Sequence, residues 1–320
     1  MKKSIVFVLL ILSSSFLKAQ TYKDWVRKAD SCYEAENYKL SVDYYSKAFK
    51  LEQKSYKDFY NAGCSASMAE ENKKAFKWLN LSIDKGYENM AHIRIDNDLK
   101  RLHSEKEWEK TIEKLQKKLD IIGANYDKVL EKQLAEIYIE DQEIRGEFMN
   151  VYRKPNADKK KIDSIGKIMG TKDSINLIKV MKILDERGWL GKNVVGEQGN
   201  KTLFLVIQHA DLEYQQKYLP MMREAAKIGN ADPGNLAYLE DRVALREGKK
   251  QIYGSQSSMN KKTNKIRIAP MIDPDNVDKR RAEVGLGTMA EYAVKLNIEW
   301  NLEAYKKELA EAEAEKLEKN

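Results

Sequence analysis

The first half of the chain repeats itself with a period of 34 residues and contains no proline before Pro155. Proline breaks helices, so this half is free to form uninterrupted, closely packed helices. A repeat of this length is typical of stacked helix pairs, each of which buries its apolar face against the next pair. The recurring aromatic and small residues are Trp25, Ala29, Cys32, Tyr38, Ser41, Tyr45 and Ala48 in the first unit, and Phe59, Gly63, Ala66, Asn72, Ala75, Leu79 and Ser82 in the second.

The spacing of these residues resembles the tetratricopeptide repeat family over about residues 22–88. Ser41, Tyr45 and Ala48 each recur as a matching residue 34 positions later. The helix-ending proline of the family pattern is absent, and Gln53 stands in its place. The resemblance implies that the concave face of the stack binds a peptide or a partner protein. The alternative is that the two repeats form only a small docking module, or pack onto the second half of the chain.

The repeat phase stops after the second unit, and we expect a capping helix to cover the open end of the stack. Ser104 and Glu107 have the spacing of a capping box, which begins a helix. An apolar stripe with helical spacing follows, formed by Trp108, Ile112, Leu115 and Leu119. We therefore place the repeats and their cap in residues 21–120.

Residues 1–20 have the pattern of a secretory signal peptide. Two lysines precede an apolar run from Ile5 to Leu12, and a small residue, Ala19, follows at a plausible cleavage point. This run is too short to span a bilayer, and later apolar runs are shorter still. We therefore expect an exported protein, periplasmic or secreted, with no membrane span after cleavage.

The net charge bears on nucleic acid as a partner. The whole chain has a formal net charge of +7, but Lys2, Lys3 and Lys18 belong to the signal segment, which contains no acidic residue. The remaining 54 basic and 50 acidic residues give a net charge of +4. The basic residues are scattered among acidic ones and do not alternate with aromatic residues, so we predict no nucleic-acid partner.

Length and composition indicate a folded chain of about two domains. Hydrophobic residues make up 42% of the 320 residues, which is enough for sizeable cores. Cys32 and Cys64 are the two cysteines. Export would permit a disulfide between them, but a single pair is not a disulfide framework. A disulfide and two buried thiols are therefore both open alternatives.

We predict a separate helical domain over residues 121–300 and a charged helix over residues 301–320. Within the domain, Asp173 is expected to cap a helix after a polar, lysine-rich segment. Residues 250–256 and 265–271 alternate weakly in polarity, which predicts the two strands of a β-hairpin. The predicted fold class is therefore mostly α, with a short tetratricopeptide-like repeat followed by an α-helical domain that contains a small hairpin.

Several separate motifs within residues 126–296 resemble a bacterial domain of unknown function that occurs alone or behind helical repeats. In chain order they are Asp141-Gln142-x-x-Arg145, Gly188-Trp189, Gln208-His209-Ala210-Asp211, Tyr218-Leu219-Pro220, Asp241-Arg242, Gln251-x-Tyr253-Gly254-x-Gln256 and Arg280-Arg281. Two positions depart from the family pattern, since Leu190 stands where Pro is expected and Ser255 where Thr is expected. The family has no established chemistry, so the resemblance implies no mechanism.

The motifs of well-known enzyme classes are missing from this sequence. It contains no G-x-S-x-G elbow, no C-x-x-C pair, no H-E-x-x-H and no phosphate loop. His209 is the single histidine of the second half, which excludes a multi-histidine metal site there. We therefore predict no metal and no cofactor, with a site of one histidine and two carboxylates as the alternative.

The candidate chemistry lies in a group of polar residues in the second half. His209 closes an apolar run and is the candidate general base, with Asp241 or Asp141 to orient it. Arginine, glutamine and tyrosine side chains could bind an anionic or polyhydroxylated ligand. The candidate ligand-binding residues are Asp141, Gln142, Arg145, Gln208, Arg242, Gln251, Tyr253, Gln256, Arg280 and Arg281. The alternative is a structural network that satisfies buried polar groups.

Two functions fit these observations. The first is an exported interaction or ligand-binding protein, in which the repeats dock a partner and no reaction is catalysed. The second is a hydrolase or transferase in which His209 is the general base and the arginines stabilise developing negative charge. Convergence of His209, Asp241 and Tyr253 with an arginine on an open pocket would favour a site, and mutually satisfied buried side chains would favour a network. The sequence leaves the oligomeric state open.

Overall fold

The computed structural model describes residues 21–53, 55–154, 156–260, 265–296 and 298–317. The predicted signal peptide, residues 1–20, lies outside these ranges. The described chain is mostly helical with one two-stranded antiparallel sheet, so the predicted fold class is confirmed. No helix in the described ranges is long and apolar enough to cross a membrane.

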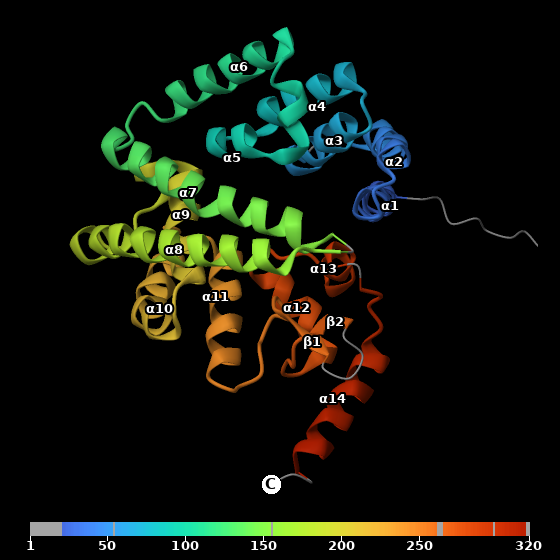
Figure 1. The fold of residues 1–320 in the computed structure, drawn as a ribbon, viewed down its shortest axis with the longest axis vertical. Coiled ribbons are helices and arrows are strands. Elements are labelled where there is room, and N and C mark those ends of the chain that lie inside the picture. The colour runs from blue at the N-terminus through green and yellow to red at the C-terminus, as the bar shows by residue number, and fades with distance from the viewer. Residues whose placement is uncertain (1–20, 54, 155, 261–264, 297, 318–320) are drawn as a thin grey trace, which may run out of the picture.

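The first part of the fold consists of two repeated helix pairs followed by shorter helices and a longer closing helix (Figure 1). The elements are α1 (Tyr22–Glu34), α2 (Tyr38–Leu51), α3 (Tyr56–Met68), α4 (Asn72–Lys85), α5 (Met90–Ile95), the 3-10 helix η1 (Asn97–Leu102) and α6 (Lys106–Ile122). The closing helix α6 packs against α4, as expected of a cap. It begins after Glu105, so the capping box predicted at Ser104 is wrong.

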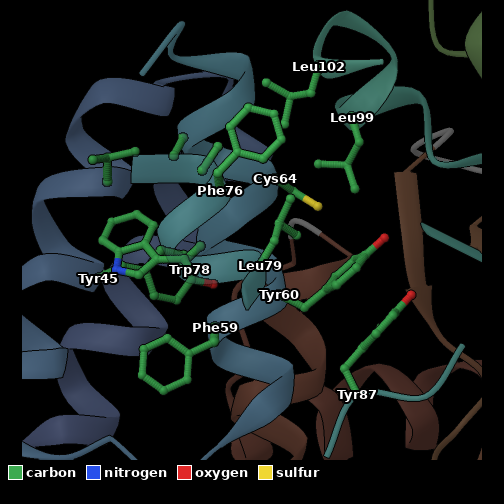
Figure 2. Packing of buried hydrophobic residues seen from close by; sticks show 14 of the residues in the cluster. Tyr45, Phe59, Tyr60, Cys64, Phe76, Trp78, Leu79, Tyr87, Leu99 and Leu102 are labelled. Carbon is green, nitrogen blue, oxygen red and sulfur yellow. The ribbon is translucent and has the colours of Figure 1, made fainter. Parts of the chain in front are cut away.

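Small residues allow the paired helices to approach closely. A Cβ atom on Gly63 of α3 would lie 2.8 Å from Cδ2 of Leu79 on α4, closer than carbon atoms can pack. Ser41 and Ser65 are fully buried, and their hydroxyl oxygens are 3.0 Å apart between α2 and α3. The remaining space holds large side chains, of which Figure 2 shows Tyr45, Phe59, Tyr60, Phe76, Trp78, Tyr87, Leu99 and Leu102. The recurring small and aromatic residues of the sequence therefore form one core.

The second part of the fold has five long helices around a second apolar core, then a hairpin, short helices and the final helix around a third. The long helices are α7 (Lys128–Tyr152), α8 (Lys159–Arg187), α9 (Lys192–His209), α10 (Leu212–Lys227) and α11 (Pro233–Arg246). The later elements are β1 (Ser257–Asn260), β2 (Lys265–Ile268), η2 (Pro274–Asn276), α12 (Val277–Glu283), α13 (Met289–Lys295) and α14 (Leu302–Leu317).

Two local predictions are corrected by the structure. Helix α8 begins at Lys159, where the carboxylate of Asp158 accepts the backbone N–H of Lys160 at 2.9 Å, so Asp173 lies inside a helix and is not its cap. A lysine-rich segment without an internal proline can be a solvated helix face, and Asp158 provides the cap that starts it. The hairpin exists, but β1 begins at Ser257, in the segment that the sequence assigned to the loop.

The helix pairs contact the second half at both ends of the stack. Helix α5 packs against α7, and α1 packs against α13; the second of these contacts lies on the right-hand side of Figure 1. This arrangement corresponds to the alternative that the repeats pack onto the second half. Both cysteines are free thiols, with Cys64 buried in the first core and Cys32 half-buried.

Candidate functional site

His209 forms a hydrogen-bonded pair with Asp141. His209 is the last residue of α9, and its Nδ1 lies 2.9 Å from Oδ1 of Asp141 on α7. Arg145, one turn further along α7, lies 3.1 Å from the same oxygen, and Gln142 donates to Oδ2 at 2.6 Å. The exposed fraction is 18% for the His209 side chain and 2% for that of Asp141. Of the two predicted partners for His209, the structure therefore places Asp141 in contact.

The surroundings of Asp141 keep its carboxylate ionised. Burial raises its pKa, but hydrogen bonds from His209 and Gln142 and the positive charge of Arg145 outweigh burial, so the net pKa lies below the usual value. An ionised carboxylate on Nδ1 orients the imidazole ring and leaves Nε2 to exchange a proton or bind a ligand. Within the described ranges, Nε2 of His209 has no hydrogen-bond partner.

Asp173 also belongs to this network, although the sequence predicted it only as a helix cap. Arg145 donates from Nη2 to both carboxylate oxygens of Asp173 on α8, each at 2.9 Å. Once the helix is extended back to Lys159, Asp173 and the buried Asn176 and Val180 follow at spacings of three and four. This periodicity was the signal that could have placed Asp173 on the face of α8 that packs against α7.

Asp241 has a different role from the one that the sequence allowed it. It is fully buried on α11 and accepts backbone N–H groups from Ile252 at 2.6 Å, Tyr253 at 3.0 Å and Ser255 at 2.9 Å. All of these donors lie in the segment before β1. His209 is not among its contacts. The catalytic prediction for Asp241 therefore has no geometric support, and its carboxylate holds the segment that leads into the hairpin.

Three more of the predicted ligand-binding residues bind the same segment and its surroundings. Gln251 donates from Nε2 to the carbonyl oxygens of Gln256 at 3.0 Å and of Ala269 at 2.7 Å. Arg281 donates to the carbonyl oxygen of Tyr253 at 2.7 Å. Arg280 donates to the carbonyl oxygen of residue 252 at 2.9 Å. Their donors are thus used by the fold, as the structural alternative expected. The Tyr253 side chain is half-buried, and burial raises the pKa of its hydroxyl.

Arg242 lies between the segment before β1 and the end of α9 that carries His209. It donates from Nε to Oε1 of Gln256 at 3.1 Å and from Nη1 to the carbonyl oxygen of Gln208 at 2.9 Å. Arg246, one turn further along α11, donates to the carbonyl oxygen of Ala210 at 2.7 Å. Arg246 was not among the predicted residues, although its spacing of four from Arg242 places both on one helix face. The two arginines and His209 therefore gather at the C-terminal end of α9.

Two predicted ligand-binding residues, Gln142 and Arg145, also line a cleft of about 560 Å³ between η1 and α7. The opposite wall includes His92, Asp96 and Asp98. The pKa of Asp98 is raised to about 6 by burial and by the negative charge of Asp96. This cleft is formed by both halves of the chain, and its lining is mainly polar.

Cys64, Asp96 and Asp98 place one potential metal-ligand atom each within 4.8 Å of one another. Tyrosine hydroxyls already donate to both carboxylates, from Tyr60 to Asp96 at 2.8 Å and from Tyr33 to Asp98. Burial raises the pKa of the Cys64 thiol well above its usual value, which keeps the thiol protonated. The protein's own donors therefore satisfy this cluster.

Fold and site together define a mostly helical protein with a histidine–carboxylate pair and an arginine pair at the end of one long helix. The chain belongs to the family described as "Family of unknown function (DUF6624)", which matches residues 128–305. The resemblance predicted for the second half is thereby confirmed, and the matched range does not include the helix pairs. No curated protein and no solved structure matches the chain.

Proposed function

We propose that the protein is exported and binds a small anionic or polar ligand at the C-terminal end of α9. The observation that carries the proposal is the pair Arg242 and Arg246. Both bind neutral oxygen atoms, and no carboxylate in the described ranges forms an ion pair with either. They lie beside His209, which is partly exposed. Guanidinium groups without a carboxylate partner are the groups that proteins use to bind anions.

The charges at this place repel one another. Burial, followed by the positive charges of Arg246 and Arg145, lowers the pKa of Arg242 to about 10. The carbonyl groups at the C-terminal end of α9 offset part of this repulsion through the helix dipole. A bound anion would offset much more, because it brings a full negative charge to a partly buried position.

Two buried amide groups, one beside His209 in the chain and one a turn from Asp173 along α8, also support a polar ligand. Oε1 of Gln208, the residue before His209, is buried without a hydrogen-bond partner in the described chain. Both amide atoms of Asn176, one turn after Asp173, are likewise buried without a partner there. Buried polar groups are almost always paired, so groups that the fold does not satisfy favour a bound molecule.

For the helix pairs we propose a supporting role. Through η1 they provide one wall of the cleft that Gln142 and Arg145 line. The tetratricopeptide-like spacing further suggests a docking surface for a peptide or protein partner. Pull-down with the complete protein, repeated with substitutions at the exposed residues Arg27 and Lys28 of α1 and Lys57 and Asn61 of α3, would test that docking role.

Native mass spectrometry of the complete protein, purified from the cell fraction to which it is exported, tests the ligand proposal. The expected result is a retained small molecule that is lost in the double variant Arg242→Gln, Arg246→Gln and kept in Arg223→Gln. Arg223 is a suitable control because it lies on α10, is half exposed and already has an acidic partner, Glu240 of α11. A wild-type spectrum without adducts, together with no thermal stabilisation by any tested ligand, would contradict the proposal. N-terminal sequencing of the same sample tests removal of residues 1–19.

The His209–Asp141 pair favours one alternative, a hydrolase or transferase. In a histidine general base, a carboxylate typically orients the imidazole through Nδ1 and leaves Nε2 available to accept a proton. The retained molecule, once identified, can be incubated with the wild type and with His209→Gln. Conversion by the wild type and binding without conversion by the variant would establish the enzyme. Binding without conversion by both would leave the ligand-binding function.

A further inference from the structure

We propose that the arginine pair selects a phosphoryl dianion, either inorganic phosphate or a phosphate monoester. This inference rests on the proposed ligand-binding function and specifies its ligand. The acidic groups of the His209 network already have partners, and the exposed Asp211 forms no ion pair with either arginine in the described chain. Asp173 is bound through two hydrogen bonds to Arg145, and Asp141 is bound to His209 and Gln142. Two positive charges, on the two α11 arginines, are left without an acidic partner in the described chain.

The geometry brings these two charges together. Arg242 and Arg246 are four residues apart on α11, so their side chains leave the same face of the helix. Each is anchored by a carbonyl oxygen at the end of α9, from Gln208 at 2.9 Å and from Ala210 at 2.7 Å. His209 lies between these two anchor residues in the chain. The two guanidinium groups are therefore fixed at carbonyl groups that flank His209 in the chain, at the C-terminal end of α9.

The number of hydrogen-bond donors fits a phosphoryl group. A guanidinium has five N–H donors, of which Arg242 uses two, one on Nε and one on Nη1, and Arg246 uses one on Nη1. Both Nη2 amino groups are left to donate. A phosphoryl group offers three acceptor oxygens and a charge near −2 at neutral pH, and arginine binds such oxygens in pairs. A monocarboxylate would use fewer donors and balance one charge.

Isothermal titration of the complete purified protein tests this selection. The probes are inorganic phosphate, glycerol 3-phosphate, sulfate and acetate at matched ionic strength. We expect the three doubly charged anions to bind at least about tenfold more tightly than acetate. Comparing inorganic phosphate with glycerol 3-phosphate distinguishes the two possible ligands. Tighter binding of inorganic phosphate indicates a site for free phosphate, and tighter binding of glycerol 3-phosphate indicates a site for a phosphate monoester.

Single variants connect the selection to the arginines. Arg246→Gln is the more informative one, because Arg246 is exposed and its loss should leave the fold intact. We expect each of Arg242→Gln and Arg246→Gln to weaken phosphate binding about tenfold or more, and Arg223→Gln to leave it unchanged. Circular dichroism and the urea midpoint verify folding of each variant.

Three results would overturn the dianion proposal. They are equal affinity for acetate and phosphate, unchanged phosphate affinity in Arg246→Gln, and retention of an uncharged molecule with no binding of any anion. Each of these would leave ligand binding itself in place. Absence of any retained molecule and of any titratable ligand would overturn both proposals.

Discussion

Replacing Asp241 by Asn tests whether this carboxylate holds the segment before β1. In the wild type, Oδ1 accepts two backbone N–H groups, from Ile252 and Tyr253, and Oδ2 accepts those of Ser255 at 2.9 Å and of Tyr253 at 3.2 Å. In Asp241→Asn, one oxygen becomes an NH₂ group. At least one buried backbone N–H then faces a donor, and the remaining bonds lose the assistance of the negative charge. We expect the free energy of unfolding to fall by about 2–4 kcal/mol.

The assay is urea unfolding followed by tryptophan fluorescence, with Trp189 buried in the second core as a reporter. The matched control is Asp211→Asn, because Asp211 is exposed and its side chain makes no capping bond to α10. Its effect should stay within about 0.5 kcal/mol. Equal unfolding midpoints for the two variants would refute the structural role of Asp241. If Asp241→Asn instead lost ligand binding at unchanged stability, Asp241 would have a role in the ligand site.

Three further outcomes follow from the first core. Gly63→Ala should lower the free energy of unfolding by about 1–3 kcal/mol, because its Cβ would overlap the facing leucine. Gly166→Ala, with no atom within 4 Å of its Cβ, should be neutral or stabilising. Thermal melts of both variants check this. The pKa of Asp98 is raised to about 6, so its ionisation costs stability as the pH rises from 4 to 6. Asp98→Asn should therefore be more stable than the wild type by about 1–2 kcal/mol at pH 7, and this difference should shrink towards pH 4. Urea titrations at both pH values measure it, and a difference that stays constant would contradict the raised pKa. Iodoacetamide should leave Cys64 unmodified until the protein is unfolded, because the thiol is buried and its pKa is raised; peptide mapping of native and denatured samples measures this.

The helix pairs could be predicted because their signal is local and periodic. Gly63 and Ser41 stand at close helix contacts, and the spacing of 34 residues alone places them there. The predicted helix was shorter than α8, because a lysine-rich sequence is compatible both with a loop and with a solvated helix face. Its true start at Lys159 depends on a single capping side chain, that of Asp158.

The partners within the site could be predicted only as a set of residue types. His209 was identified, but the choice between Asp141 and Asp241 depends on which of two helices packs beside the end of α9. That choice is made by tertiary packing, of which a single sequence carries no direct signal. Asp241 and Arg242 are neighbours in the chain, yet one holds a backbone segment and the other lies beside the histidine. Adjacent residues on a helix point about 100° apart, so sharing a motif does not mean sharing a role.

The contact between α1 and α13 has a consequence for how the protein folds. The two helix pairs make contacts between neighbours in sequence, and such local contacts form early and quickly. The contact of α1 with α13 joins residues near position 30 to residues near position 290, so it closes almost the whole chain into a ring. It can form only after nearly all of the chain has been synthesised or translocated. We therefore expect the face of α1 that meets α13 to stay exposed throughout synthesis, and its burial to be among the last steps of folding.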